Sequence, residues 1–93
     1  MTRHARSRAL ERFPEVASED LVELITRAVR ENRDDLVEYM GLTRDDMFLA
    51  YYRFRTCAGR NGIAVVNTAG PYVVTVMHEK MYLETRRGTI ELT

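Results

Sequence analysis

The chain has 93 residues, the size of one domain with a modest core that needs no metal or disulfide. Its one cysteine, Cys57, cannot form an internal bridge, so we expect a reducing, cytoplasmic environment. No apolar run approaches the roughly 20 residues that span a bilayer, and no signal-peptide core follows Met1. We therefore expect a single soluble domain over residues 1–93 with no membrane partner.

The net charge is zero, but the charges are unevenly distributed. Residues 1–12 hold four arginines against one glutamate, residues 13–46 hold four arginines against ten acids, and residues 47–93 hold six basic residues against three acids. The two basic ends can therefore meet as one positive surface in the fold. Of the 14 basic residues, 13 are arginine. This excess suits bidentate phosphate recognition, and it is equally typical of codon usage in a GC-rich genome.

The first half of the chain predicts helices. One helix is expected from about Thr2 to Glu11, ending before Pro14, with Ala5, Ala9 and Leu10 on its apolar side. A second helix is expected after Ser18, which is a good N-cap residue. Its apolar stripe has helical spacing and comprises Leu21, Val22, Leu24, Ile25, Ala28 and Val29. A further helical turn or two is expected over Leu36–Met40, stopped by Gly41.

From Met47 the apolar period changes to two, which predicts strands. In the first strand a core face alternates with a second face. The core face comprises Phe48, Ala50, Tyr52 and Phe54, and the second comprises Leu49, Tyr51, Arg53 and Arg55. Turns at Gly59–Gly62 and Ala69–Pro71 separate strands at Ile63–Asn67 and Tyr72–His78, and 81–85 and 89–92 can add one or two more. The fold class is therefore α+β, with two to three N-terminal helices packed on one face of a three- to five-stranded antiparallel meander sheet.

The start of the chain carries the first candidate site. His4, Arg8 and Arg12 fall at i, i+4 and i+8, so they share one face of the first helix. Histidine can move a proton near neutral pH, and arginine can hold phosphate oxygens. Metal-free RNA cleavage needs a base for the 2′-OH, cations for the phosphate and an acid for the leaving oxygen. The same pattern is also typical of a plain solvated helix face.

At this point the chain resembles small phage- and toxin-associated domains placed with the barnase–EndoU–colicin–RelE group of ribonuclease folds. The resemblance rests on His4, Ala5, Arg8, Glu11, Arg12 and the strand Val73–Val76, and by element order it extends over most of the chain. It implies RNA cleavage in a bacterial host cell without metal or cofactor, with the helix histidine and arginines and Thr75 near the site. Fold alone does not establish activity.

Other residues offer partial support for a site of this kind. His78 can supply the complementary acid, but Thr75 and His78 are three apart along a strand and so point to opposite faces unless a bulge intervenes. Tyr51, Tyr52, Arg53 and Arg55 are candidates for substrate binding. Thr75 is also a good β-former in any role, and His78 at a strand end is typical of an exposed, inert residue.

A second function class competes with the nuclease. The acidic stretch from Glu15 to Asp46 can dock on a basic protein, which would make the chain a non-catalytic phage or bacterial factor that inhibits a host complex. The expected protein partner is therefore an antitoxin for the nuclease or a host complex for the inhibitor. Zero net charge also counts against strong nonspecific RNA affinity. Other classes lack their patterns: two histidines and one cysteine give no zinc spacing, and no glycine-rich loop links a strand to a helix.

Overall fold

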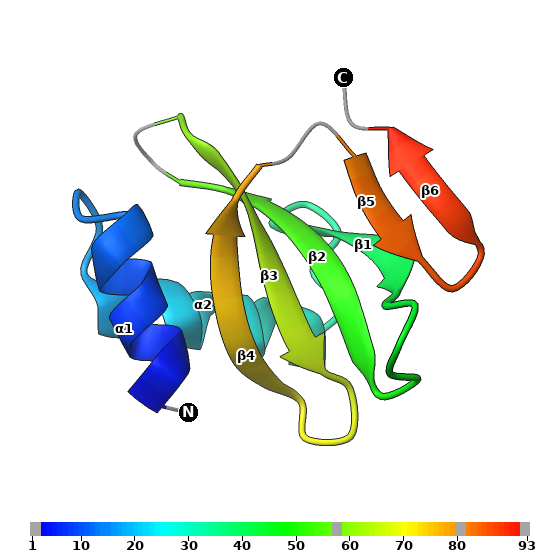
Figure 1. Ribbon diagram of the computed structural model, residues 1–93. Coiled ribbons are helices and arrows are strands. Elements are labelled where there is room, and N and C mark those ends of the chain that lie inside the picture. Colours follow the sequence, from blue (N-terminus) through cyan, green and yellow to red (C-terminus); the bar gives the residue numbers. More distant parts are fainter. Residues whose placement is uncertain (1–2, 57–58, 80–81, 92–93) are drawn as a thin grey trace.

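The computed structural model describes residues 3–56, 59–79 and 82–91 (Figure 1). The elements in chain order are α1 (Arg3–Arg12), α2 (Ser18–Arg30), β1 (Val37–Leu42), β2 (Leu49–Arg55), β3 (Asn61–Asn67), β4 (Tyr72–His78), β5 (Tyr82–Thr85) and β6 (Gly88–Glu91). Within the described ranges, no helix is both long and apolar enough to cross a bilayer. Cys57 lies outside these ranges.

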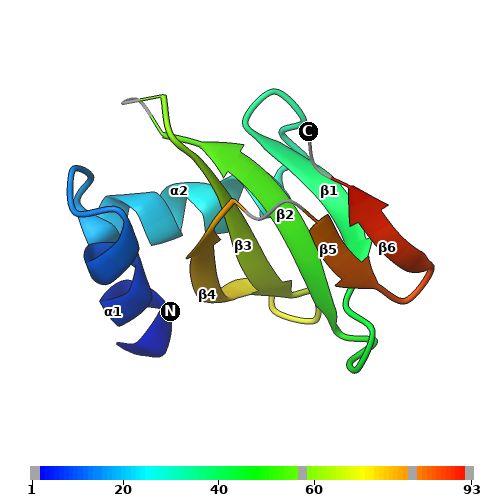
Figure 2. The same ribbon diagram turned by 45° about the horizontal axis from the view of Figure 1, so that its top comes forward.

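The sheet is an antiparallel meander in the order β1-β2-β3-β4, and β5 and β6 form a separate two-stranded sheet. The helix α2 lies across one face of the meander, and α1 runs alongside β4 at its edge (Figures 1 and 2). The expected α+β class with N-terminal helices and a meander is confirmed. The last two predicted strands exist, but they form their own hairpin.

The first helix packs through small residues. Ala5 and Ala9 are fully buried, and Phe13, just after the helix, is buried with them in the main core. The helix ends at Arg12, as expected for a chain approaching Pro14. The prediction for Leu10 was wrong, because its side chain is 61% exposed. The side of α1 that packs on the sheet is made of the small residues Ala5 and Ala9. Leu10 lies beside this narrow buried side and faces solvent.

The second helix carries the strongest apolar stripe, and most of it is confirmed. The residues buried on α2 are Leu21, Val22, Ile25 and Ala28. Leu24 is half exposed, which corrects the prediction for that position. Ser18 is the first helical residue rather than the N-cap; Ala17 has that place, with no side-chain capping bond. The helix start therefore relies on Glu19 and Asp20 in its first turn.

The predicted helical turn over Leu36–Met40 was wrong, because these residues enter the strand β1. Its pairing with β2 contains an irregularity between Tyr39 and Gly41, with Met40 as the extra residue. Gly41 has φ of +117°, which only glycine adopts readily. The bulge interrupts the alternation of a strand, so the apolar spacing of this segment resembles that of a helix.

The two faces of the meander differ. Ala50 and Phe54 are buried on the helix side with Tyr52 packed beside them, as the alternation predicts. Phe48 precedes the strand and is 56% exposed, so its predicted place in the core was wrong. On the opposite face, Leu83 of the C-terminal hairpin packs with Ile63 in a second, smaller cluster. We call this second side the open face, because the hairpin covers only part of it.

Candidate functional site

The seam between α1 and β4 is tied by Arg12. Its guanidinium donates a hydrogen bond from Nη1 to the carbonyl oxygen of Val76, at 2.6 Å in a partly buried position. Because β4 is an edge strand, this carbonyl has no neighbouring strand to pair with on that side. Arg12 therefore satisfies a backbone acceptor at the edge of the sheet. This bond uses one of the five N–H groups of its side chain.

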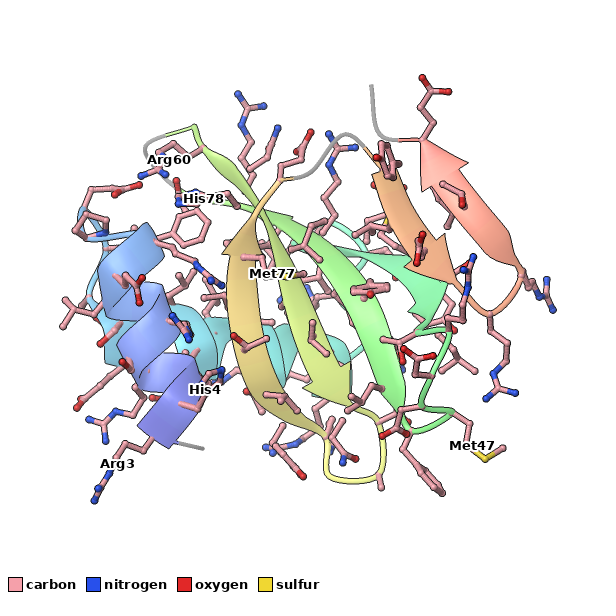
Figure 3. All side chains as sticks on the ribbon, viewed as in Figure 1. Arg3, His4, Met47, Arg60, Met77 and His78 are labelled. Carbon is pink, nitrogen blue, oxygen red and sulfur yellow. The ribbon has the colours of Figure 1, made fainter. Side chains whose placement is uncertain are left out.

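His4, Arg8 and Arg12 are called the helix pattern below. His4 and Arg8 lie N-terminal to Arg12 on α1. Arg8 is half-buried and pairs with Glu11 at 3.0 Å, whereas His4 at the start of the helix is exposed. Figure 3 shows His4 on the side of α1 that borders β4. Eight residues of helix separate His4 from Arg12, which is about 12 Å along the axis. The structure thus brings the three residues along one seam, with only Arg12 bonded across it.

Thr75 lies on the open face of β4. It stands opposite Val65, and Val65 stands opposite Tyr51, so these three residues form one row across the open face. A register shift leaves Val74 as the extra residue of a bulge, N-terminal to Thr75. His78 faces the helix side, where its ring lies 5.3 Å from that of Phe13. The expected opposition of Thr75 and His78 is confirmed, because the bulge does not fall between them.

A cluster around Arg60 was not visible in the sequence. Its guanidinium donates to Glu15 at 2.9 and 3.0 Å and to the carbonyl of Arg12 at 3.1 Å, and it lies 5.0 Å from the ring centre of Phe13. It also contacts Nδ1 of His78 at 3.0 Å (Figure 3). A guanidinium only donates, so Nδ1 accepts and the neutral ring carries its proton on Nε2. These partners are far apart in sequence, and no spacing connects them.

The four residues proposed for substrate binding are divided between the faces. Tyr51 and Arg53 lie on the open face, in register with Val65 and Ile63, and Arg55 follows on the same side. Tyr52 packs on the helix side, where Tyr39 meets its ring at 5.5 Å. Burial raises the pKa of Tyr52, and the neighbouring Tyr39 raises it further. This phenol therefore stays protonated near neutral pH and serves packing.

Two arginines of the open face, Arg53 and Arg55, differ in whether their side chains are bonded to other residues. Arg53 forms a bidentate pair with Glu79, with N–O distances of 2.9 and 3.1 Å, and both side chains are about three-quarters buried. Arg55 is exposed and has no side-chain hydrogen bond or ion pair to another described residue. Of these two cations, Arg55 is the one available to an anionic ligand.

Four of the ten acids in the acidic stretch form ion pairs with arginines. The pairs are Glu15–Arg60, Glu19–Arg6, Glu23–Arg27 and Asp35–Arg33. The Arg33 hydrogen bond lowers the pKa of the exposed Asp35. The two basic ends of the chain do meet, since Arg60 contacts the end of α1, but acids accompany them. The fold therefore reduces the charge segregation of the sequence, but six of the ten acids form no ion pair with another described residue.

A hollow lies on the open face, between the meander and the C-terminal hairpin. It has a volume of about 840 Å³ and is lined by Thr43, Arg44, Asp45, Asp46, Leu49, Tyr51, Val65, Met77, Tyr82, Leu83 and Glu84. We call it the hairpin groove. A second hollow of about 420 Å³ lies between β1 and the hairpin turn and includes Arg86 and Arg87. Neither hollow is lined by any residue of the helix pattern or by Thr75.

Comparison of the chain with protein-family models, curated proteins and solved structures found no match. Among the residues that the structure describes, no three His, Cys, Asp or Glu side chains are grouped so that they could hold a metal ion. The resemblance to ribonuclease folds therefore stays a prediction.

Proposed function

We propose that this protein is a metal-independent endoribonuclease whose site follows the α1–β4 seam. The observation that supports this most is the bond from Arg12 to Val76, which holds the helix pattern against the strand that carries Thr75. His4 is exposed at the same seam, where a substrate can reach it. An imidazole and guanidinium groups along one surface supply the base and the cations that phosphodiester cleavage uses.

Each residue has a separate role in this proposal. His4 takes the proton from the 2′-OH as that oxygen bonds to phosphorus, and the 5′-oxygen leaves and is protonated by solvent water. Arg8 and Arg12 hold the phosphate through N–H groups that their present bonds leave free. An RNA strand that crosses the edge of β4 would reach Thr75 on the open face, where the hydroxyl can donate to a phosphate oxygen.

Cleavage of a mixed tRNA and mRNA pool in EDTA tests this proposal. We expect fragments with the wild-type protein and a loss of at least about 100-fold in rate with His4→Ala, as for removal of a general base. Arg3→Ala is the matched control, because Arg3 is also exposed at the start of α1 but lies on another face. It should cleave like the wild type.

Two results would overturn the proposal. One is the absence of cleavage by the wild-type protein, and the other is unchanged cleavage by His4→Ala. A His78→Ala variant adds a second arm to the experiment. If His78→Ala abolishes cleavage while His4→Ala retains it, the reaction belongs to the Arg60 cluster and the seam is not its site.

A further inference from the structure

The hairpin groove has two firmly held walls. One wall is the open face of the meander, and the other is β5, whose Leu83 is buried against Ile63. The hairpin is anchored a second time, because Thr43 bridges to Thr85 and the N–H of Arg86 donates to the carbonyl of Leu42 at 3.0 Å. A groove between two anchored walls keeps its shape before a ligand arrives, which lowers the entropic cost of binding.

The floor of the groove is apolar and its sides are aromatic. Leu49, Val65 and Met77 contribute aliphatic surface, and Figure 3 shows Met77 on β4. Tyr51 and Tyr82 contribute rings, and Tyr82 is 58% exposed. Sites with an apolar lining and a few polar groups at the margin are typical of ligand binding, and this volume lies within their usual range.

The rim determines which ligand fits. Asp45, Asp46 and Glu84 place three carboxylates there against one arginine, Arg44, which pairs with Glu84 at 3.5 Å. Asp46 accepts a bond from the N–H of Phe48 at 2.8 Å, which fixes its carboxylate in the loop. Asp45 has no side-chain hydrogen bond or ion pair to another described residue. The rim is therefore net negative, with one carboxylate free.

We propose that the hairpin groove binds a basic, partly apolar segment of a partner protein. Apolar side chains of the segment lie on the floor, and an arginine or lysine reaches Asp45 while its cation lies over Tyr51 or Tyr82. Nucleic acid does not fit this groove, because the carboxylates of the rim repel phosphates. The proposal concerns a surface separate from the α1–β4 seam and does not depend on RNA cleavage.

The test uses a fluorescein-labelled octapeptide of alternating arginine and leucine, with binding followed by fluorescence anisotropy at physiological salt. We expect Asp45→Lys to weaken binding by roughly fivefold or more, because it replaces an attraction by a repulsion. Asp34→Lys is the matched control: it makes the same charge change at an exposed turn outside the groove. We expect it to change binding by less than about twofold, since salt screens distant charges. Both positions are exposed, so both variants should fold.

Mapping by amide chemical shifts completes the test. On addition of the peptide we expect shifts concentrated at residues 44–46, 51, 65, 77 and 82–84. Any of four results would overturn the proposal: no binding at millimolar peptide, equal loss of binding in both variants, shifts centred on the helices, or equal binding of a peptide with glutamate in place of arginine. Binding of an octauridylate that shifts the same residues would assign the groove to nucleic acid and also overturn it.

Discussion

The two faces of the meander sheet are closed to different degrees. On the helix side, the core between the sheet and the helices contains fully buried residues: Phe13, Val22, Ala64, Val66, Val73 and Val76. On the open face, Ile63 and Leu83 are buried, but Tyr51 and Met77 are only partly covered. The first face has the packing of a core, and the second keeps a groove of about 840 Å³.

Because of this difference, we expect the helix side to contribute most of the stability and the open face to be the side that binds a ligand. Burial of apolar surface stabilises the fold, so the helix side should dominate the free energy of unfolding. A half-covered face with tyrosines and charges at its margin contributes less to stability and offers more to a ligand. Substitutions on the two faces should therefore differ in size and in how far their effects spread.

Phe13→Ala is expected to have the largest effect. The ring is fully buried between α1 and the sheet and lies 5.3 Å from the ring of Phe54. Its loss leaves a cavity and should lower the free energy of unfolding by about 3–5 kcal/mol, as measured by urea denaturation. Leu10→Ala, an exposed position three residues earlier, is the control and should change it by less than about 0.5 kcal/mol. Similar losses in both variants would contradict the assigned core.

Gly62→Ala should follow, because it adds volume to the same packed region. A Cβ at Gly62 would lie 2.4 Å from Cζ of Phe54 and 2.6 Å from Cζ of Phe13. Neither ring can withdraw without disturbing the core, so we expect a loss of about 2–3 kcal/mol. Asn61→Ala changes the preceding, exposed residue of β3 and should be close to neutral in the same urea experiment. A neutral Gly62→Ala would show that the rings have room to move.

Leu83→Ala tests the open face. Leu83 is 3% exposed and holds the hairpin on Ile63, so we expect a loss of about 2 kcal/mol. The effect should be local: amide exchange should quicken in β5 and β6 while the slowest amides of β3 change little. Tyr82→Ala, an exposed neighbour on the same strand, is the control and should leave exchange nearly unchanged. Equal quickening throughout the meander would mean that the two faces unfold as one unit.

Arg60→Ala tests the link between the helices and the loop that precedes β3. Arg60 bonds to Glu15, to the carbonyl of Arg12 and to His78, but its side chain is 43% exposed. Solvent screening reduces the contribution of such contacts, so we expect a loss of about 1 kcal/mol on urea denaturation. Arg55→Ala removes an arginine near the same loop that has no side-chain bond to another described residue, and it should cost less than about 0.5 kcal/mol. If the two variants lose equal stability, the Arg60 contacts add nothing specific.

Much of the fold could be predicted because local patterns and tertiary packing agree. Tyr72–His78 is rich in valine and follows the turn residues Ala69–Pro71, and its bounds are those of β4. The segment around Tyr39 could not be predicted in the same way, because the bulge at Met40 removes the period of two that identifies a strand. Leu10 shows a second limit: helical spacing indicates an apolar side, but only the approach of the sheet decides how wide the buried part is.

The candidate site was predictable only in part. The spacing of His4, Arg8 and Arg12 is a local property, and the structure does place them along one seam. The Arg60 cluster and the hairpin groove join residues that are distant in the chain, and no local pattern indicates such contacts. The pairing of Glu15 with Arg60 spans 45 positions, so charge counts along the sequence could not show which acids of the acidic stretch are paired.

The smallest expected effect is the pH dependence of stability that arises from Tyr52 on the helix side. Burial, and then Tyr39, raise the pKa of Tyr52 above its ordinary value of 10.0. The folded state therefore favours the neutral phenol, and this contribution is fully present below the pKa of the unfolded chain. It is lost as the pH rises through the pKa of the folded state, because ionisation then favours unfolding.

Tyr52→Phe removes this dependence and leaves the partly buried ring in place. We expect the stability of the wild-type protein relative to Tyr52→Phe to be constant at neutral pH and to fall as the pH rises past about 10, as followed by urea denaturation at each pH. Tyr82→Phe, at an exposed tyrosine, should show no such trend. The relative stability could instead stay constant or rise as the pH increases. Tyr52 would then be as well solvated as a tyrosine of the open face, and the two faces would not differ in how they affect the pKa of tyrosine.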